Sequence, residues 1–312
     1  MQLNANRQGH WSYLFARFIG GLCCSHGTAA LALAQPRCNS NAFGNPHAAA
    51  HRQPDPYADP QCDGHTNLHA SPTPCAANGT LQRVEIAVAA LRRPMPVQVY
   101  LPPCYPQQAQ YPVLFLLHGQ NADEGQWPRL GIAEAADRLI RSQAIRPLII
   151  VMPREEYWWI NPFDGPFEAS FFEGLMPWVE ASYPICAGAG CRALGGLSRG
   201  AAWAVNLGFS HPGVFGSIGA HSLPPFSGDA ERLPYWLRAF GEQPLPKLYL
   251  DVGEKDRYHK ATEQFEKTLT DLQVPHEWVL QPGAHDEAYW AAHVEDYLRW
   301  YDQAWALPAR AD

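Results

Sequence analysis

Strand-like and helix-like segments alternate along the chain from Leu81 onward, and this alternation constrains the fold more than any other feature. Several strand-like segments are continuous apolar runs, notably residues 113–117 and 148–152. Such runs are typical of strands with helices packed on both faces. The first two strands adjoin without a helix, which predicts an antiparallel start to a sheet that is parallel afterwards. The predicted strands are residues 84–88, 97–101, 113–118, 148–152, 192–195, 217–220, 248–252 and 276–280.

Helical periodicity fills most of the intervals between the later strands. In the last helix-like segment, Trp290, Val294 and Leu298 recur at a spacing that places them on one face. The pattern as a whole predicts an α/β fold, with a mostly parallel sheet, antiparallel N-terminal strands and helices on both faces. The predicted helices are residues 132–142, 170–183, 198–209, 259–273 and 286–301.

The first 34 residues have the features of an export signal. They contain no acidic residue, and Arg7 and Arg17 precede or border a mostly apolar run that ends in Ala32-Leu33-Ala34. This ending fits the A-x-A rule for signal-peptide cleavage. We expect residues 1–34 to be a signal peptide, and the alternative is an amphipathic or disordered extension. Polar residues interrupt the run, so it makes a poor membrane span.

The cysteine count also favours export. Of the 8 cysteines, two lie within the proposed signal, and an even number remains. Three disulfides in an oxidising compartment, either secreted or periplasmic, are therefore expected. Cys186 and Cys191 form the clearest pair because a short Gly/Ala spacer separates them. A zinc site is the competing interpretation, but no C-x-x-C spacing supports it. The six remaining cysteines are Cys38, Cys62, Cys75, Cys104, Cys186 and Cys191.

Residues 35–80 differ in composition from the body of the chain. They are rich in proline, histidine, asparagine and alanine, and the prolines would interrupt any regular element. The irregular spacing of the histidines favours a solvated, disulfide-linked extension over a metal-binding tract. We therefore divide the chain into a signal (1–34), this extension (35–80) and a catalytic domain (81–312).

The charge distribution excludes one class of partner. The formal net charge is −7, and no basic stripe occurs along the chain, so binding of nucleic acid through phosphate neutralisation is not expected. Lysine is found only at Lys247, Lys255, Lys260 and Lys267.

The most informative motif is Gly196-Leu197-Ser198-Arg199-Gly200, a G-x-S-x-G match between a predicted strand and a predicted helix. The turn holds the serine in a strained backbone conformation, and side chains at the glycine positions would collide with neighbouring chain. Ser198 is therefore the candidate nucleophile. A glycine-rich turn without chemistry is the alternative.

A serine nucleophile needs a base that is oriented by an acid, and these follow in the order Ser, Asp/Glu, His. Asp256 lies just beyond a predicted strand and is the preferred acid, ahead of Asp251 within that strand and Glu254. His285 lies in the loop after the last strand and is the preferred base. The competing histidines are His259, His276 and His293.

The developing oxyanion needs two backbone donors. One is expected to be the amide of Arg199, directly after the nucleophile. The other is expected after residues 113–118, where Gly119 allows close approach and Gln120 is preferred to Asn121. An ordinary strand-ending turn is the alternative.

These motifs resemble the "Putative esterase" (esterase D-like) family of α/β-hydrolases, which includes feruloyl and acetyl-xylan esterases, S-formylglutathione hydrolase, enterochelin esterase and antigen 85 mycolyltransferases. The resemblance covers roughly residues 81–305 and implies an α/β-hydrolase fold with Ser198, Asp256 and His285 as the triad. It also implies a pocket-side or loop-packing role for Trp127. The segments that carry it are residues 116–127, 196–200, 253–256 and 283–290.

The aromatic loop after residues 148–152 is the other candidate part of the pocket. It carries Trp158 and Trp159, which could line an aryl or sugar subsite or could pack an ordered loop. Glu155 and Glu156 are adjacent, so they are unsuited to flank a sugar ring as glycosidase carboxylates.

The expected function is that of an exported serine hydrolase that cleaves carboxylic esters, either small molecules or polysaccharide-linked, without metal or organic cofactor. One alternative is an acyltransferase that uses the same triad with an alcohol or sugar acceptor. The other is a hydrolase-like binding protein that has lost catalysis. The family spans several substrates, so membership alone does not name one.

Overall fold

A single mixed sheet forms the centre of the molecule. The structure, a computed structural model, describes residues 77–156, 159 and 161–305. Its 8-stranded sheet has the order β1-β2-β4-β3-β5-β6-β7-β8. β1 pairs antiparallel with β2, β2 pairs antiparallel with β4, and the remaining pairs are parallel. The strands are β1 Thr80–Ile86, β2 Met95–Leu101, β3 Val113–Leu117, β4 Ile149–Pro153, β5 Arg192–Leu197, β6 Ser217–His221, β7 Lys247–Gly253 and β8 Glu277–Gln281.

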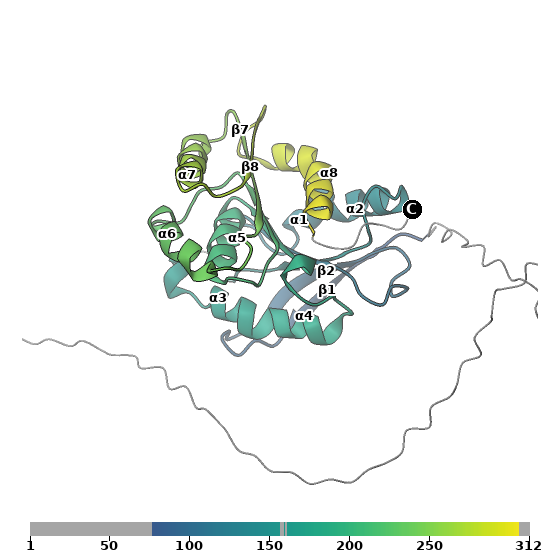
Figure 1. The fold of residues 1–312 in the computed structure, drawn as a ribbon. Helices are drawn as coiled ribbons and strands as arrows, with labels where there is room; N and C mark the ends of the chain where they lie inside the picture. Colours follow the sequence, from purple (N-terminus) through teal and green to yellow (C-terminus); the bar gives the residue numbers. More distant parts are fainter. Residues whose placement is uncertain (1–76, 157–158, 160, 306–312) are drawn as a thin grey trace, which may run out of the picture. The chain divides into compact units, whose positions relative to one another are not determined.

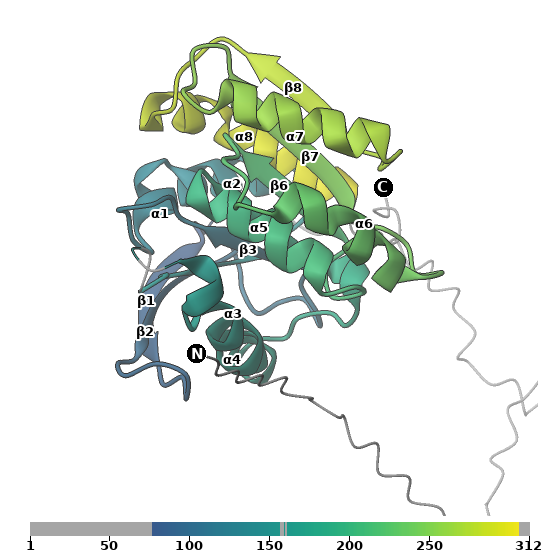
Figure 2. The same ribbon diagram turned by 90° about the vertical axis from the view of Figure 1, so that its left-hand side faces the viewer.

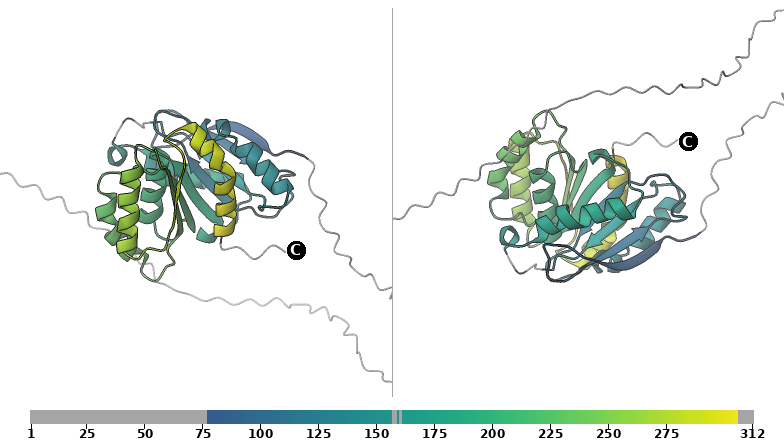
Figure 3. Two further views of the ribbon diagram at one scale, coloured as in Figure 1. Left: turned by 90° about the horizontal axis from the view of Figure 1, so that it is seen from above. Right: turned by 90° about the horizontal axis from the view of Figure 1, so that it is seen from below.

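Helices cover both faces of this sheet (Figures 1 and 3). α5, α6 and α7 lie on one face, and α2 and α8 lie on the other, as Figure 2 also shows from the side. The predicted α/β class with an antiparallel N-terminal start is therefore confirmed. The helices are α1 Gln126–Arg129, α2 Ile132–Arg141, α3 Phe167–Ala169, α4 Met176–Ser182, α5 Arg199–Ser210, α6 Asp229–Phe240, α7 His259–Asp271 and α8 Glu287–Ala304.

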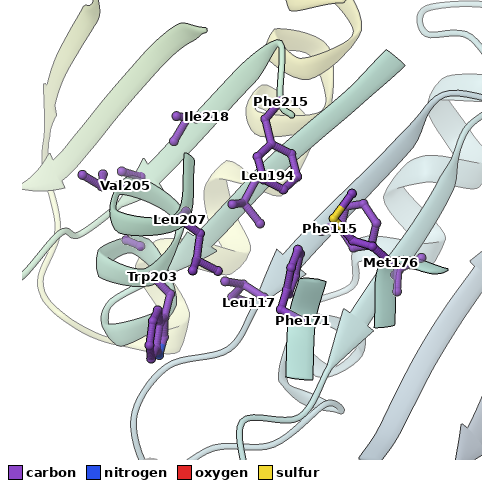
Figure 4. Close-up of a cluster of buried hydrophobic side chains, with 14 of the residues drawn as sticks. Phe115, Leu117, Phe171, Met176, Leu194, Trp203, Val205, Leu207, Phe215 and Ile218 are labelled. Carbon is purple, nitrogen blue, oxygen red and sulfur yellow. The ribbon is translucent and has the colours of Figure 1, made fainter. Parts of the chain in front are cut away.

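Alternation along the strands builds two cores. In β3, Phe115 and Leu117 point to the face of α5, and Leu114 and Leu116 point to the face of α8. This follows from the period of two in a strand, so a continuous apolar run serves both faces. Figure 4 shows the first core, where Phe115, Leu117 and Trp203 lie among other buried side chains.

Two helical segments differ from the sequence-based predictions. α6 was not predicted, because Pro234 lies inside it and proline usually ends a helix. The helix predicted at residues 170–183 is divided. The helical segment starts before the predicted range, as α3, then continues as a π-helical stretch, Ser170–Leu175, and ends as α4.

The disulfide predicted from the Gly/Ala spacer is present, with an S–S bond joining Cys186 and Cys191. Cys104 is disulfide-bonded as well. The predicted signal peptide, and the extension up to residue 76, lie outside the described residues. Within the described part of the chain, no helix has both the length and the apolar character needed to cross a membrane.

Candidate active site

The parallel strands β3, β5, β6, β7 and β8 all end at the same edge of the sheet, and the candidate site lies there. Ser198 follows β5 directly and caps α5. Its backbone has φ 53° and ψ −121°, a strained conformation for a residue with a side chain. The Ser198 amide donates to the carbonyl of His221 at the end of β6 (2.8 Å), which holds the turn against the sheet.

Steric contacts explain both glycines of the turn. A Cβ placed on Gly196 would lie 2.4 Å from backbone atoms of Gly200. A Cβ on Gly200 would lie 2.3 Å from the carbonyl oxygen of Leu117 in β3. Because these neighbours are backbone rather than movable side chains, only glycine fits at either position.

Three side chains predicted from separate segments meet at this point. His285 Nε2 lies 2.9 Å from Ser198 Oγ, and His285 Nδ1 lies 2.8 Å from Asp256 Oδ2. The ionised carboxylate can only accept, so Nδ1 carries the proton and Nε2 is left to accept from the serine hydroxyl. The side chains of His285 and Asp256 are 6% and 0% exposed, so little water competes for these bonds.

Aromatic rings hold the imidazole of His285 in its orientation. Tyr258 and Trp290 present their rings edge-on to it, with centroids 4.8 Å and 5.0 Å away. The base is therefore restrained by packing as well as by the carboxylate.

Asp256 is held in its ionised form. Burial alone raises the pKa of the carboxyl group, but hydrogen bonds from His285, the Tyr258 amide and the Ser222 hydroxyl outweigh burial. The net result is a lowered pKa, so Asp256 is a carboxylate at neutral pH.

The competing residues lie elsewhere. Asp251 is fully buried inside β7 and bonds to His221, not to His285. The ring of His276 pairs with Glu266 (Nε2 to Oε1, 3.3 Å), and the ring of His293 pairs with Asp296 on α8 (Nδ1 to Oδ2, 3.3 Å). The structure thus brings together Ser198, His285 and Asp256, as preferred in the sequence, and not these alternatives.

The loop after β3 is held by two buried side chains. The Gly119 amide donates to Gln126 Oε1 (2.8 Å), and the Gly119 carbonyl lies 2.8 Å from His118 Nδ1. With both polar groups of Gly119 engaged, the next amide, that of Gln120, has no partner among the residues that the structure describes. Neither His118 nor Gln126 is singled out by the sequence; their place within residues 116–127, one of the segments that carry the family resemblance, is the only signal.

Arg199, the residue after Ser198, is fixed by Glu155. The guanidinium forms two bonds to the carboxylate, Nε to Oε2 at 2.8 Å and Nη2 to Oε1 at 2.6 Å. Both side chains are nearly buried, at 11% and 6% exposed. Arg199 begins α5, so its amide belongs to the positive end of that helix, where an anion is stabilised.

The candidate pocket residues divide into three cases. Trp127 is 1% exposed, and its indole donates to the Leu117 carbonyl (3.0 Å). This position in the core corrects the substrate-binding expectation and supports the loop-packing alternative. Trp159 is 60% exposed on the loop after β4, and Trp158 lies outside the described residues.

Among the described side chains, no group of three or more His, Cys, Asp or Glu residues could hold a metal ion.

The fold and site together define an α/β-hydrolase, and known structures share this fold. A ferulic acid esterase aligns with a TM-score of 0.65 at 24% identity, covering 73% of this chain and 99% of that one. FphF, a fluorophosphonate-binding serine hydrolase of Staphylococcus aureus, aligns with a TM-score of 0.60 at 20% identity over 72% of this chain and 99% of its own.

The chain belongs to the family described as "Putative esterase", whose family model matches residues 88–301. It is 35% identical to Esterase Rv1288 of Mycobacterium tuberculosis, over 61% of this chain and 52% of that protein. It is 30% identical to an endo-1,4-beta-xylanase/feruloyl esterase of Xylanibacter ruminicola, over 54% of this chain and 26% of that protein. The chain thus spans about half, or less, of the length of these curated relatives.

Proposed function

We propose that this protein is a serine hydrolase that cleaves carboxylic esters, with Ser198 as nucleophile, His285 as base and Asp256 as acid. The observation that carries the proposal is the continuous hydrogen-bonded line from Ser198 Oγ through His285 to Asp256, with steps of 2.9 Å and 2.8 Å. Membership of the esterase family supports the same reaction class.

The first half of the reaction follows from the positions of these atoms. His285 Nε2 removes the proton from Ser198 Oγ as the oxygen attacks the ester carbonyl. The amides of Gln120 and Arg199 stabilise the oxyanion of the tetrahedral intermediate. His285 then gives its proton to the leaving alcohol, and an acyl group remains on Ser198.

In the second half, water replaces the alcohol. His285 removes a proton from the water as its oxygen attacks the acyl carbonyl. His285 then returns this proton to Ser198 Oγ as the bond between Oγ and the acyl carbon breaks, and the acid is released. Asp256 holds the imidazole in one tautomer and stabilises its protonated form throughout, because its lowered pKa keeps it ionised.

We also propose that the protein is exported to the periplasm or the medium. The Cys186–Cys191 disulfide supports an oxidising compartment. The composition of residues 1–34 supports the same route. A polysaccharide-linked aryl ester is one substrate to test, since one sequence relative is named a xylanase/feruloyl esterase and a protein of similar fold is a ferulic acid esterase.

The test is turnover and active-site labelling of Ser198→Ala beside the wild type. We expect the wild type to hydrolyse p-nitrophenyl acetate and to react with a fluorophosphonate probe, and the variant to do neither. Ser142→Ala is the control, because its hydroxyl only donates to the Leu139 carbonyl on α2. Full activity in Ser198→Ala would disprove the proposal.

The substrate and the acceptor can be separated by product analysis. Acetyl, butyryl, feruloyl and long-chain esters would be compared by kcat/KM. Formation of a new ester when a sugar alcohol is added would assign acyl transfer instead of hydrolysis.

A further inference from the structure

A second buried polar cluster lies beside the proposed triad and takes no part in the reaction steps above. At its centre, the fully buried carboxylate of Asp251 in β7 accepts hydrogen bonds from two neighbouring elements, β6 and α8. From β6, His221 Nδ1 lies 2.6 Å from Oδ1. From α8, the hydroxyls of Tyr289 and Tyr297 donate to Oδ2 at 2.6 Å and 2.9 Å. One anion therefore joins β6, β7 and α8.

Burial keeps the donors of this cluster protonated. It raises the pKa of Tyr289 and of Tyr297, and the negative charge of Asp251 raises both further. Both hydroxyls therefore remain donors over the whole pH range in which the enzyme would work.

Each segment that Asp251 joins also carries part of the proposed active site. On β6, the backbone carbonyl of His221 accepts from the Ser198 amide at 2.8 Å. On α8, Trp290, next to Tyr289, packs its ring edge against His285. The Trp290 indole also donates to the Ser222 hydroxyl at 3.0 Å, directly after His221.

The contact between α8 and the sheet is close enough to transmit small shifts. The ring of His221 stacks on Tyr297 with centroids 3.6 Å apart. Cβ atoms built on Gly195 and Gly219 would both collide with the hydroxyl of Tyr301, so these strand glycines admit the helix. A helix seated this tightly follows any movement of its anchoring carboxylate.

A purely stabilising role does not account for the choice of residues. A buried carboxylate with its donors is expensive to desolvate, and apolar side chains of similar volume commonly give equal or greater stability. A directional network instead fixes distances and angles between the elements that it joins.

We propose that Asp251 is a positioning residue that sets the nucleophile turn and the catalytic histidine relative to one another, through His221 on one side and Tyr289 and Tyr297 on the other. The inference rests on the proposed function, because it concerns the geometry of the same site. Loss of one anchor shifts α8, and with it His285, relative to Ser198.

The test compares Tyr289→Phe and Tyr297→Phe with Tyr100→Phe. Tyr100 is a matched control, since its buried hydroxyl on β2 also donates to an aspartate, Asp137 of α2, at 2.7 Å, and since β4 and β3 lie between β2 and the strand that leads to Ser198. We expect all three to lower the melting temperature. Only the two α8 variants should lower kcat, by about tenfold, while KM stays within about twofold.

The rate of fluorophosphonate labelling provides a second readout, because it depends on the attack of Ser198 and not on ester binding. It should fall in parallel with kcat in Tyr289→Phe and Tyr297→Phe. Asp251→Asn should lower both by about 100-fold if the variant folds, and the tyrosine variants decide the matter if it does not.

The outcomes separate this inference from the proposed function. An active wild type whose α8 variants match Tyr100→Phe in kcat and labelling would overturn the positioning role alone. A wild type that neither hydrolyses esters nor labels would overturn both. A fall in kcat restricted to the α8 variants would support the inference.

Discussion

Glu155 and Arg199 form a nearly buried ion pair with two hydrogen bonds, 2.8 Å and 2.6 Å long, directly beside Ser198. The pair joins the loop after β4 to the first residue of α5. It therefore fixes the residue whose amide we propose as an oxyanion donor. A bidentate carboxylate–guanidinium pair is directional, so it restrains orientation as well as distance.

We expect Glu155→Gln to destabilise the fold by about 3 kcal/mol, because the guanidinium stays buried after its counter-charge is removed. Urea unfolding of the two proteins measures this difference. Lys267→Ala is the control, since its partner Asp271 lies on the surface and both side chains are more than half exposed. Equal losses of unfolding free energy in the two variants would mean that the buried pair contributes no more to stability than the exposed pair does.

The glycines around Ser198 provide a steric prediction. Gly200→Ala should lose roughly 3 kcal/mol of stability, because its Cβ would lie 2.3 Å from the Leu117 carbonyl and α5 would have to move from β3. Gly165→Ala is the control, with its nearest neighbour, Asn161 O, at 3.7 Å. Thermal unfolding compares them, and a melting temperature unchanged in Gly200→Ala would contradict the close contact.

Replacing the proposed acid should have a large effect on the rate and a small effect on substrate binding. Asp256→Asn leaves a similar shape but removes the charge that fixes the His285 tautomer, so kcat should fall by about 10⁴. Asp251→Asn should lower kcat much less, because Asp251 contacts His221 rather than His285. Steady-state kinetics on one ester distinguish the two, and the reverse order would reassign the acid to Asp251.

Local patterns in the sequence were sufficient for the sheet and for the residues that meet at its edge. Eight segments of strand-like pattern predict the eight strands. The glycines on either side of Ser198 predict that this residue lies on a sharp turn between a strand and a helix. The loop positions of Asp256 and His285 followed from where the strands β7 and β8 end. Each of these signals lies within a short stretch of chain, so each can be recognised without the fold.

Features that depend on contacts between distant segments could not be recognised in this way. The helix α6 continues through Pro234, although a proline in the sequence predicts the end of a helix. In the sequence, Glu155 stands out only because Glu156 is adjacent to it. In the structure it pairs with Arg199, which lies at the end of β5, whereas Glu155 lies at the end of β4. The sequence leaves Trp127 open between a pocket-side and a loop-packing role, and only the contact of its indole with the Leu117 carbonyl of β3 decides for packing.

His118 should make stability fall in mild acid. Its Nε2 accepts from the Glu155 amide at 2.8 Å, so the ring must be neutral. Burial lowers its pKa below the ordinary 6.5. The folded state then binds fewer protons than the unfolded state, so stability is full above pH 6.5 and is lost as pH falls from there through the folded pKa.

The measurement is urea unfolding of the wild type and His118→Gln at pH 7.5 and pH 5.5. The glutamine cannot gain a proton, so the loss of stability between the two pH values should be smaller in the variant. A variant that loses as much as the wild type would show that other groups control the acid side.

Asp229 should have the opposite pH dependence. Burial raises its pKa from 3.8 to about 6, and hydrogen bonds from Asn206 and Arg232 only partly oppose this. The Oδ2 atom is buried and has no hydrogen-bond partner within the part of the chain that the structure describes. Because the folded-state pKa is the higher one, the protonated form stabilises the fold below pH 3.8, and this contribution is lost as pH rises through about 6.

Asp229→Asn removes that titration while keeping a polar group of the same shape. Relative to the wild type, the variant should gain about 2 kcal/mol of stability between pH 4 and pH 7, which is most of the free energy that corresponds to the raised pKa. The absolute difference at either pH also contains the cost of placing an amide beside Asn206, so only the change with pH is diagnostic. Asp271→Asn on the surface of α7 is the control, with a difference that should stay within about 0.5 kcal/mol. A constant difference between Asp229→Asn and the wild type would show that Asp229 is ionised at no cost, and that the water-excluded start of α6 accommodates its charge.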